Sequence, residues 1–141
     1  MKTIAALASV LALSAPAFAA TQIHVVEHAA TDATAKVGGQ ADNRGDILTF
    51  TNDLFDAANK KKIGGDNGFC IRTELGKAYA CEWTNALPGG QITVQGPFLD
   101  AGDTTLAVTG GTGKYAGARG EMLLHARDAK GTEYDFEFTL K

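Results

Sequence analysis

The side chains best placed to do chemistry in this sequence are a glutamate and an asparagine that both follow apolar residues. Glu27 comes directly after two valines, and Asn52 shares the alternation of Leu48 and Phe50. A glutamate facing an apolar interior loses hydration, which raises its pKa and makes it a candidate acid, base or dipole. On the outer face it would be an ordinary solvated side chain. A lone amide on an apolar face needs a partner, which is either a ligand atom or nearby backbone.

Aromatic and charged residues further along the chain allow two interpretations each. Arg72 has the strand parity of Cys70, so it forms either an interior pair with Glu27 or Glu82, or a surface pair. The aromatic side chains either line a pocket or pack a small core, and packing is the more frequent role. These aromatic residues are Trp83, Phe98, Tyr134, Phe136 and Phe138.

Several kinds of chemistry find no support in the sequence. The formal net charge of -3 argues against a nucleic-acid partner, whose signature is a basic patch. The glycine-rich segment 109–120 is not a phosphate-binding loop, because Val108 and Tyr115 stand where that motif requires glycine and Ser or Thr. No Ser/His/Asp order is apparent, no histidine has ligand spacing to a cysteine, and we expect neither a metal nor an organic cofactor.

The first nineteen residues have the pattern of an export signal. Lys2 supplies the positive start, residues 4–13 form a short apolar run, and Ala17-Phe18-Ala19 is the small-residue A-x-A motif that precedes a cleavage site. The apolar run is too short for a resident membrane helix, although an anchored N-terminus is the alternative. We therefore expect cleavage after Ala19, a mature chain of residues 20–141 without a membrane span, and a periplasmic or secreted location.

If the chain is exported, its two cysteines enter an oxidising compartment. Cys70 and Cys81 are the only cysteines in the chain. An oxidising compartment favours a disulfide between them, which would close a short loop. A free buried pair and a single reactive thiol are the alternatives.

The rest of the mature chain shows short alternating segments separated by turn residues. This pattern predicts a single all-β domain, an eight-stranded antiparallel sandwich or barrel. We expect a long loop over residues 29–43 and solvated turns at 59–62 and 64–68. The eight expected strands span residues 22–27, 45–55, 69–74, 78–85, 91–99, 104–109, 117–128 and 132–140.

Several of these segments resemble the allene oxide cyclase family, in the same order and at similar spacing. The matching segments are GDILTFTN at 45–52, GFC at 68–70, ITVQGPFL at 92–99 and DTTLAVTGG at 103–111, followed by YAG at 115–117 and LH at 124–125. The glycine-rich elements also resemble dirigent proteins. The resemblance implies an eight-stranded barrel with a mostly apolar cavity, commonly in a homotrimer.

The resemblance also implies roles for individual residues. Glu27 resembles the first-strand glutamate that promotes opening of a strained epoxide in the plant cyclases. Asn52 and Cys70 fall on cavity positions, and Phe98 stands where the family has a cavity tyrosine. We therefore expect Leu48, Phe50, Asn52 and Phe98 to line a ligand cavity, with Glu27 as the catalytic residue.

Three functions follow from these observations. The first is an exported barrel that binds a small hydrophobic or phenolic molecule and steers its reaction as dirigent proteins do. The second is an isomerase or cyclase of the allene oxide cyclase type that uses Glu27. The third is a non-catalytic structural oligomer with a filled barrel. A cavity that is open and contains a buried Glu27 would favour the second.

Overall fold

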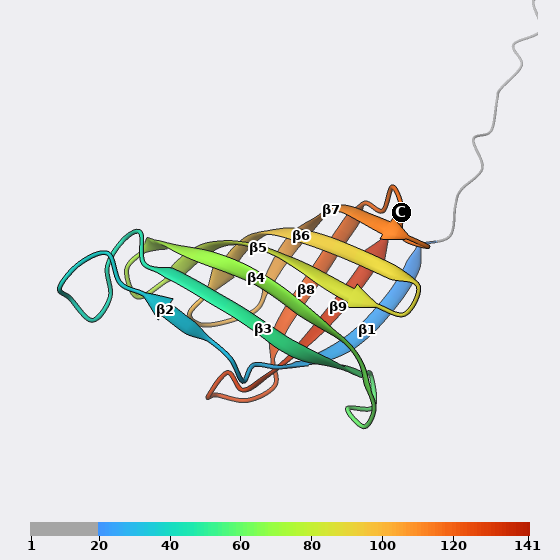
Figure 1. Cartoon of the computed structure of the whole chain (residues 1–141), viewed down its shortest axis with the longest axis horizontal. Coiled ribbons are helices and arrows are strands. Elements are labelled where there is room, and N and C mark those ends of the chain that lie inside the picture. The colour runs from blue at the N-terminus through green and yellow to red at the C-terminus, as the bar shows by residue number, and fades with distance from the viewer. Residues whose placement is uncertain (1–19) are drawn as a thin grey trace, which may run out of the picture.

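The computed structural model describes residues 20–141, which form a barrel of β-strands (Figure 1). The expected export signal at 1–19 lies outside the described residues and stays a prediction. Within the described part, no helix is long and apolar enough to cross a membrane. The strands are β1 (Thr21–His28), β2 (Ala33–Ala35), β3 (Ile47–Asp56), β4 (Lys62–Glu74), β5 (Ala78–Leu87), β6 (Gly90–Leu99), β7 (Thr104–Gly113), β8 (Gly120–Ala126) and β9 (Glu133–Leu140).

The barrel closes through the first strand. Neighbouring strands pair in the order β1-β9-β8-β7-β6-β5-β4-β3-β2, and β1 also pairs with β3. All of these pairs are antiparallel. Eight strands therefore form a closed ring, which protects its edges by pairing them. This confirms the predicted all-β, eight-stranded antiparallel barrel.

The N-terminal part of the described chain pairs with β3 twice, first through β1 and then through the short strand β2. β1 pairs with β3 from Val25 to His28, and β2 rejoins β3 at Ala33–Ala35, opposite Ile47–Thr49. The chain between β1 and β2 leaves the ladder and arches past the middle of β3. The long loop expected over residues 29–43 is therefore interrupted by a strand, and the arch lies beside the site described below.

Alternating side chains point inward and fill one end of the barrel. Leu54, Ile92, Leu106, Met122 and Phe138 are fully buried and belong to one continuous apolar cluster. Burial of this apolar surface is the main force that stabilises the barrel. The other end of the barrel holds the cavity.

The prediction of a solvated turn at residues 64–68 was wrong. These residues belong to β4, and Asp66 within them is 1% exposed. The glycines allow close contact between strands: a Cβ at Gly68 would collide with the Cβ of Trp83 and with the carbonyl oxygen of Glu82. Glycine in a strand often marks such a close approach and is easily mistaken for a turn signal.

The predicted disulfide is present. Cys70 and Cys81 are directly opposite each other on β4 and β5, with their Cα atoms 4.0 Å apart, and are bonded through sulfur. The link joins two neighbouring strands of the barrel wall beside the cavity, because Cys70 also lines that cavity.

We expect replacement of both cysteines by serine to lower the free energy of unfolding by about 2–3 kcal/mol, because the unfolded chain loses a short covalent loop. Urea unfolding of the oxidised wild type and of the double variant measures this difference. The wild type treated with reductant is the matched control, and it should fall to the same midpoint. Equal midpoints for all three samples would contradict a stabilising role.

Candidate ligand cavity and its buried acid pair

A cavity of about 650 Å³ occupies one end of the barrel. Its lining includes residues of the β1–β2, β6–β7 and β8–β9 connections, so the mouth lies at the end of the barrel where these connections meet. Ligand sites in proteins commonly have volumes of about 300–1,000 Å³. The interior is therefore not filled, which contradicts the hypothesis of a structural barrel with a packed interior.

The wall of the cavity is mainly apolar and aromatic. Leu48, Phe50 and Phe98, three of the predicted cavity residues, line it, as do Trp83 and Phe136. The rings contact one another: Phe50 and Phe136 lie 5.9 and 5.7 Å from Trp83, centroid to centroid. Such ring contacts hold the aromatic side chains in fixed orientations and provide a surface suited to an apolar ligand.

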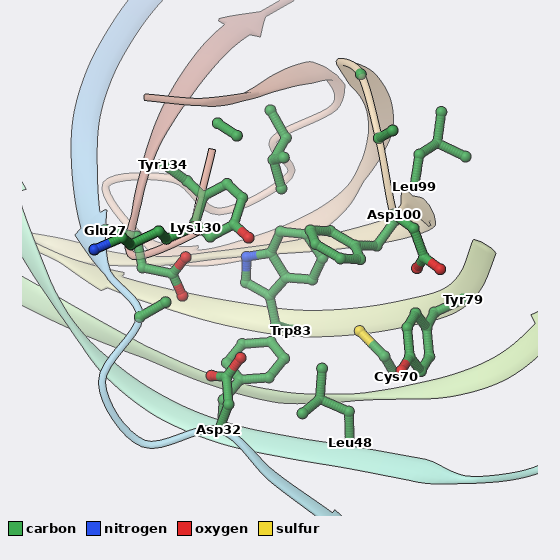
Figure 2. Close-up of a pocket in the computed structure, with 18 of the residues that line it drawn as sticks. Glu27, Asp32, Leu48, Cys70, Tyr79, Trp83, Leu99, Asp100, Lys130 and Tyr134 are labelled. Atoms are coloured by element: carbon green, nitrogen blue, oxygen red, sulfur yellow. The ribbon is translucent and has the colours of Figure 1, made fainter. Parts of the chain in front are cut away.

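Glu27 lies in this wall and points into the cavity (Figure 2). It is near the end of β1, between its partner residues Leu54 on β3 and Tyr134 on β9, and is 6% exposed. Its inward orientation follows from alternation, because Val25, two residues earlier, belongs to the core. The Nδ2 atom of Asn52 donates a hydrogen bond of 2.9 Å to Oε1 of Glu27.

Asn52, the fourth predicted cavity residue, is not among the residues that line the cavity. Its amide instead joins the arch between β1 and β2 to Glu27. Its Oδ1 accepts hydrogen bonds from the backbone N–H groups of Ala30 and Thr31 and from the Thr31 hydroxyl. Asn52 therefore holds the glutamate in position, and its partners are backbone and protein side chains.

Asp66 is the second buried carboxyl group of the site. It is the register partner of Asn52 on β3 and of Asn85 on β5, and its Oδ1 accepts a 3.3 Å hydrogen bond from the backbone N–H of Asn52. Its Oδ2 is buried and has no partner within the described residues. Burial raises the pKa of Asp66 to about 7, although the nearby Glu27 carboxyl and the backbone N–H of Asn52 act in the opposite direction.

The pKa of Glu27 is raised well above its ordinary value. Burial is the largest cause, and the negative charge of Asp66 adds to it, followed by a smaller contribution from Asp32. The hydrogen bond from Asn52 lowers the pKa but does not offset burial. Two carboxyl groups in one buried site cannot both ionise readily, so a charge on either one favours the protonated form of the other.

Two further polar groups face the same region of the cavity. The indole Nε1 of Trp83 is buried and has no hydrogen-bond partner in the described residues, and the residue is 3% exposed. Burial, and then the charges of Glu27 and Asp32, raise the pKa of Tyr134 to about 12, so its hydroxyl keeps its proton. Figure 2 shows both groups on the side of the cavity where Glu27 lies.

The mouth of the cavity carries a separate ionic cluster. Arg72 is 8% exposed and binds Asp100 through Nη1, at 2.6 and 2.8 Å, while Nη2 donates to the Tyr79 hydroxyl at 2.8 Å. Asp42 lies 2.9 Å from Nε of Arg72. Arg72 is thus an interior residue, paired with neither Glu27 nor Glu82, and it links the loops around the mouth.

Sequence reasoning missed Asp66 and did not single out the nitrogen of Trp83. A signal for Asp66 was present, because it has the same strand parity as Cys70 and Arg72 if β4 is extended backwards through the glycines. No sequence signal distinguishes a tryptophan whose nitrogen is unpartnered from one that only packs.

Comparison with known proteins assigns this barrel to a family. The sequence model of the allene oxide cyclase family matches residues 23–127. The chain belongs to the allene oxide cyclase family. The match includes residues 23–28 of β1, among them Glu27, as well as the strands that carry Asn52, Asp66 and Trp83.

Proteins whose solved structures have this fold are named for different reactions. A pyocyanin demethylase superposes with a TM-score of 0.75 at 26% identity, over 86% of this chain and 100% of the demethylase. A pterocarpan synthase dirigent protein gives 0.69 at 16% identity, over 86% and 92% of the two chains. A Diels-Alderase from Streptomyces koyangensis also gives 0.69 at 16% identity, over 86% of this chain and 63% of the enzyme. The last two similarities concern the fold alone.

Proposed function

We propose that this protein is an exported barrel that binds a small hydrophobic or phenolic molecule in its cavity, and that Glu27 promotes an isomerisation or cyclisation of that molecule. The observation that carries the proposal is a buried carboxyl group that faces an open, largely apolar cavity. A carboxyl group with a raised pKa in such a setting is suited to give and take back a proton near neutral pH.

The proposed reaction requires one proton, which the acid pair of Glu27 and Asp66 supplies. Glu27 transfers a proton to an oxygen or nitrogen atom of the bound molecule as charge develops there, and bonds within the molecule rearrange. The carboxylate then recovers a proton from the product, so the net proton count is unchanged. Asp66, with a pKa of about 7, can hold a proton during this cycle.

A binding barrel that steers a reaction without taking part in it is the second candidate. The continuous aromatic wall favours this function, because it would fix the orientation of a flat ligand. The demethylase to which the chain is similar is named for pyocyanin, a small aromatic compound, which supports the same class of ligand. The two candidates differ in whether Glu27 is required after binding.

The test is to incubate the wild type and the Glu27→Gln variant with the same organic extract of the host culture and then to identify retained molecules by native mass spectrometry. An isomerase does not change the mass of its ligand. We therefore expect both proteins to retain a molecule of one mass, and chromatography to separate two isomers of that mass, with the second isomer formed only by the wild type. One isomer with both proteins would support the steering barrel, and no retained molecule would count against both candidates.

The same spectra test the proposed assembly and location. We infer a homotrimer from the family resemblance, and outward-facing Ile47, Phe69 and Ile71 on β3 and β4 offer an apolar surface for a second copy. We expect the mature chain to begin near residue 20, to carry the disulfide and to have the mass of three chains. A monomer that retains residues 1–19 would overturn both inferences.

A further inference from the structure

The indole nitrogen of Trp83 is the most unusual polar atom of the cavity. It is fully buried, yet within residues 20–141 nothing accepts a hydrogen bond from it. A buried donor without a partner is energetically costly, so such groups are rare unless something else binds them. Trp83 also lines the cavity, and Figure 2 shows its nitrogen on the ring edge that faces Glu27 and Tyr134. The ring edge that carries this donor therefore borders the cavity.

The orientation of this ring is fixed by its neighbours. Gly68 on β4 is the register partner of Trp83, and the absence of a side chain there lets the tryptophan pack directly against the neighbouring strand. Phe50 packs edge-on against the ring and Phe136 packs against it at a tilt. Rotation of the indole nitrogen toward a protein acceptor is therefore hindered, and the donor stays directed into the cavity.

The charges around this donor restrict what can bind to it. Asp32, Asp100 and Asp128 line the cavity together with Arg72 and Lys130. The guanidinium of Arg72 is already paired with Asp100 and Asp42. These lining side chains carry more negative than positive charge whichever protonation state Glu27 has, and Asp32 acts on the region of Glu27 and Tyr134. An anionic group would be repelled there, whereas an uncharged acceptor would not.

We propose that the N–H of Trp83 binds an uncharged hydrogen-bond acceptor of the ligand, a carbonyl oxygen or a ring nitrogen, and holds that atom beside Glu27. The inference rests on the proposed function and adds the substrate class: neutral, largely apolar molecules with such an acceptor. Trp83 is then a ligand-binding residue that determines specificity, and carboxylate ligands are excluded.

Because Trp83 is the only tryptophan in the chain, its indole N–H gives a single resonance in the spectrum of the ¹⁵N-labelled protein. The probes are three molecules of similar shape: α-tetralone, which has a carbonyl group, tetralin, which has none, and tetralin carboxylate. We expect α-tetralone to shift the indole resonance downfield and to bind about tenfold more tightly than tetralin. We expect the carboxylate not to compete with α-tetralone.

The matched variants are Trp83→Phe, which removes the donor and keeps an aromatic ring, and Glu82→Gln, which changes the exposed neighbouring residue outside the cavity and keeps the donor. The preference for α-tetralone over tetralin should fall to about twofold or less in Trp83→Phe and stay near tenfold in Glu82→Gln. If Trp83→Phe does not fold, the test is whether α-tetralone shifts the indole resonance of the wild type.

The outcomes separate this inference from the proposed function. If α-tetralone and tetralin bind equally well, or α-tetralone binds without moving the indole resonance, the role of Trp83 is wrong while the binding barrel stands. Tight binding of the carboxylate overturns the restriction to neutral ligands. If no probe enters the cavity, both the inference and the proposed function fail.

Discussion

Replacement of Glu27 by glutamine is expected to lower the rate of ligand conversion by about 10²–10⁴-fold, the usual contribution of a positioned acid or base. Glutamine has nearly the same shape and can still accept the hydrogen bond that Nδ2 of Asn52 donates to Oε1. It cannot, however, transfer a proton. Ligand retention should therefore change little, by about threefold or less. Conversion is measured by chromatography of the isomers, and retention by native mass spectrometry.

The matched control for this experiment is Glu82→Gln on β5. Glu82 is exposed and precedes Trp83, so its side chain points away from the cavity. This variant should convert ligand at the wild-type rate. Equal rates for Glu27→Gln and the wild type would show that Glu27 is not catalytic, whereas loss of both retention and conversion would assign it to binding alone.

Replacement of Asp66 by asparagine is expected to stabilise the protein at pH 8 and to leave its stability at pH 4 nearly unchanged. Burial raises the pKa of Asp66 to about 7 in the folded state, from its ordinary value of 3.8. The folded protein therefore binds a proton more tightly than the unfolded chain, and its stability decreases as the pH rises from about 4 to about 7. Below pH 4 both states are protonated and the cost disappears.

Each pKa unit corresponds to about 1.4 kcal/mol, so ionisation of Asp66 costs the folded state a few kcal/mol. Asparagine avoids this cost because it does not ionise. We expect its thermal midpoint to exceed that of the wild type by roughly 5–10 °C at pH 8, measured by circular dichroism. Glu82→Gln again serves as the control, with wild-type midpoints at both pH values. If Asp66→Asn is less stable than the wild type, and by the same amount at pH 4 and pH 8, then Asp66 acts only through its hydrogen bonds.

The barrel could be predicted from the sequence because alternation is a local property. The strands that carry Phe50, Cys70, Trp83 and Phe136 were assigned from it, and the inward direction of Glu27 follows from its parity with Val25. The family resemblance added the closure of the barrel. The disulfide followed from the expected compartment and from the presence of two cysteines.

The polar part of the site was harder to predict because it depends on contacts between distant strands. Asp66 lies among glycines that mimic a turn, and only its pairing with Asn52 on β3 reveals a buried carboxyl group. Asn52 was expected to face a ligand, but its partners are the β1–β2 arch and Glu27, which the sequence does not place beside it. That the nitrogen of Trp83 lacks a hydrogen-bond partner can be recognised only from the three-dimensional structure, where the positions of its neighbours are known.

The most direct measurement is the titration of the glutamate side chains by NMR in protein labelled with ¹³C at the glutamate carboxyl carbon. Labelling of glutamate alone separates Glu27 from Asp66, its partner in the acid pair. We expect one resonance to titrate well above the others, to be absent from Glu27→Gln and to shift when α-tetralone enters the cavity. If every glutamate titrates in the ordinary range, or the high resonance does not respond to the probe, Glu27 is not a neutral acid in the ligand cavity.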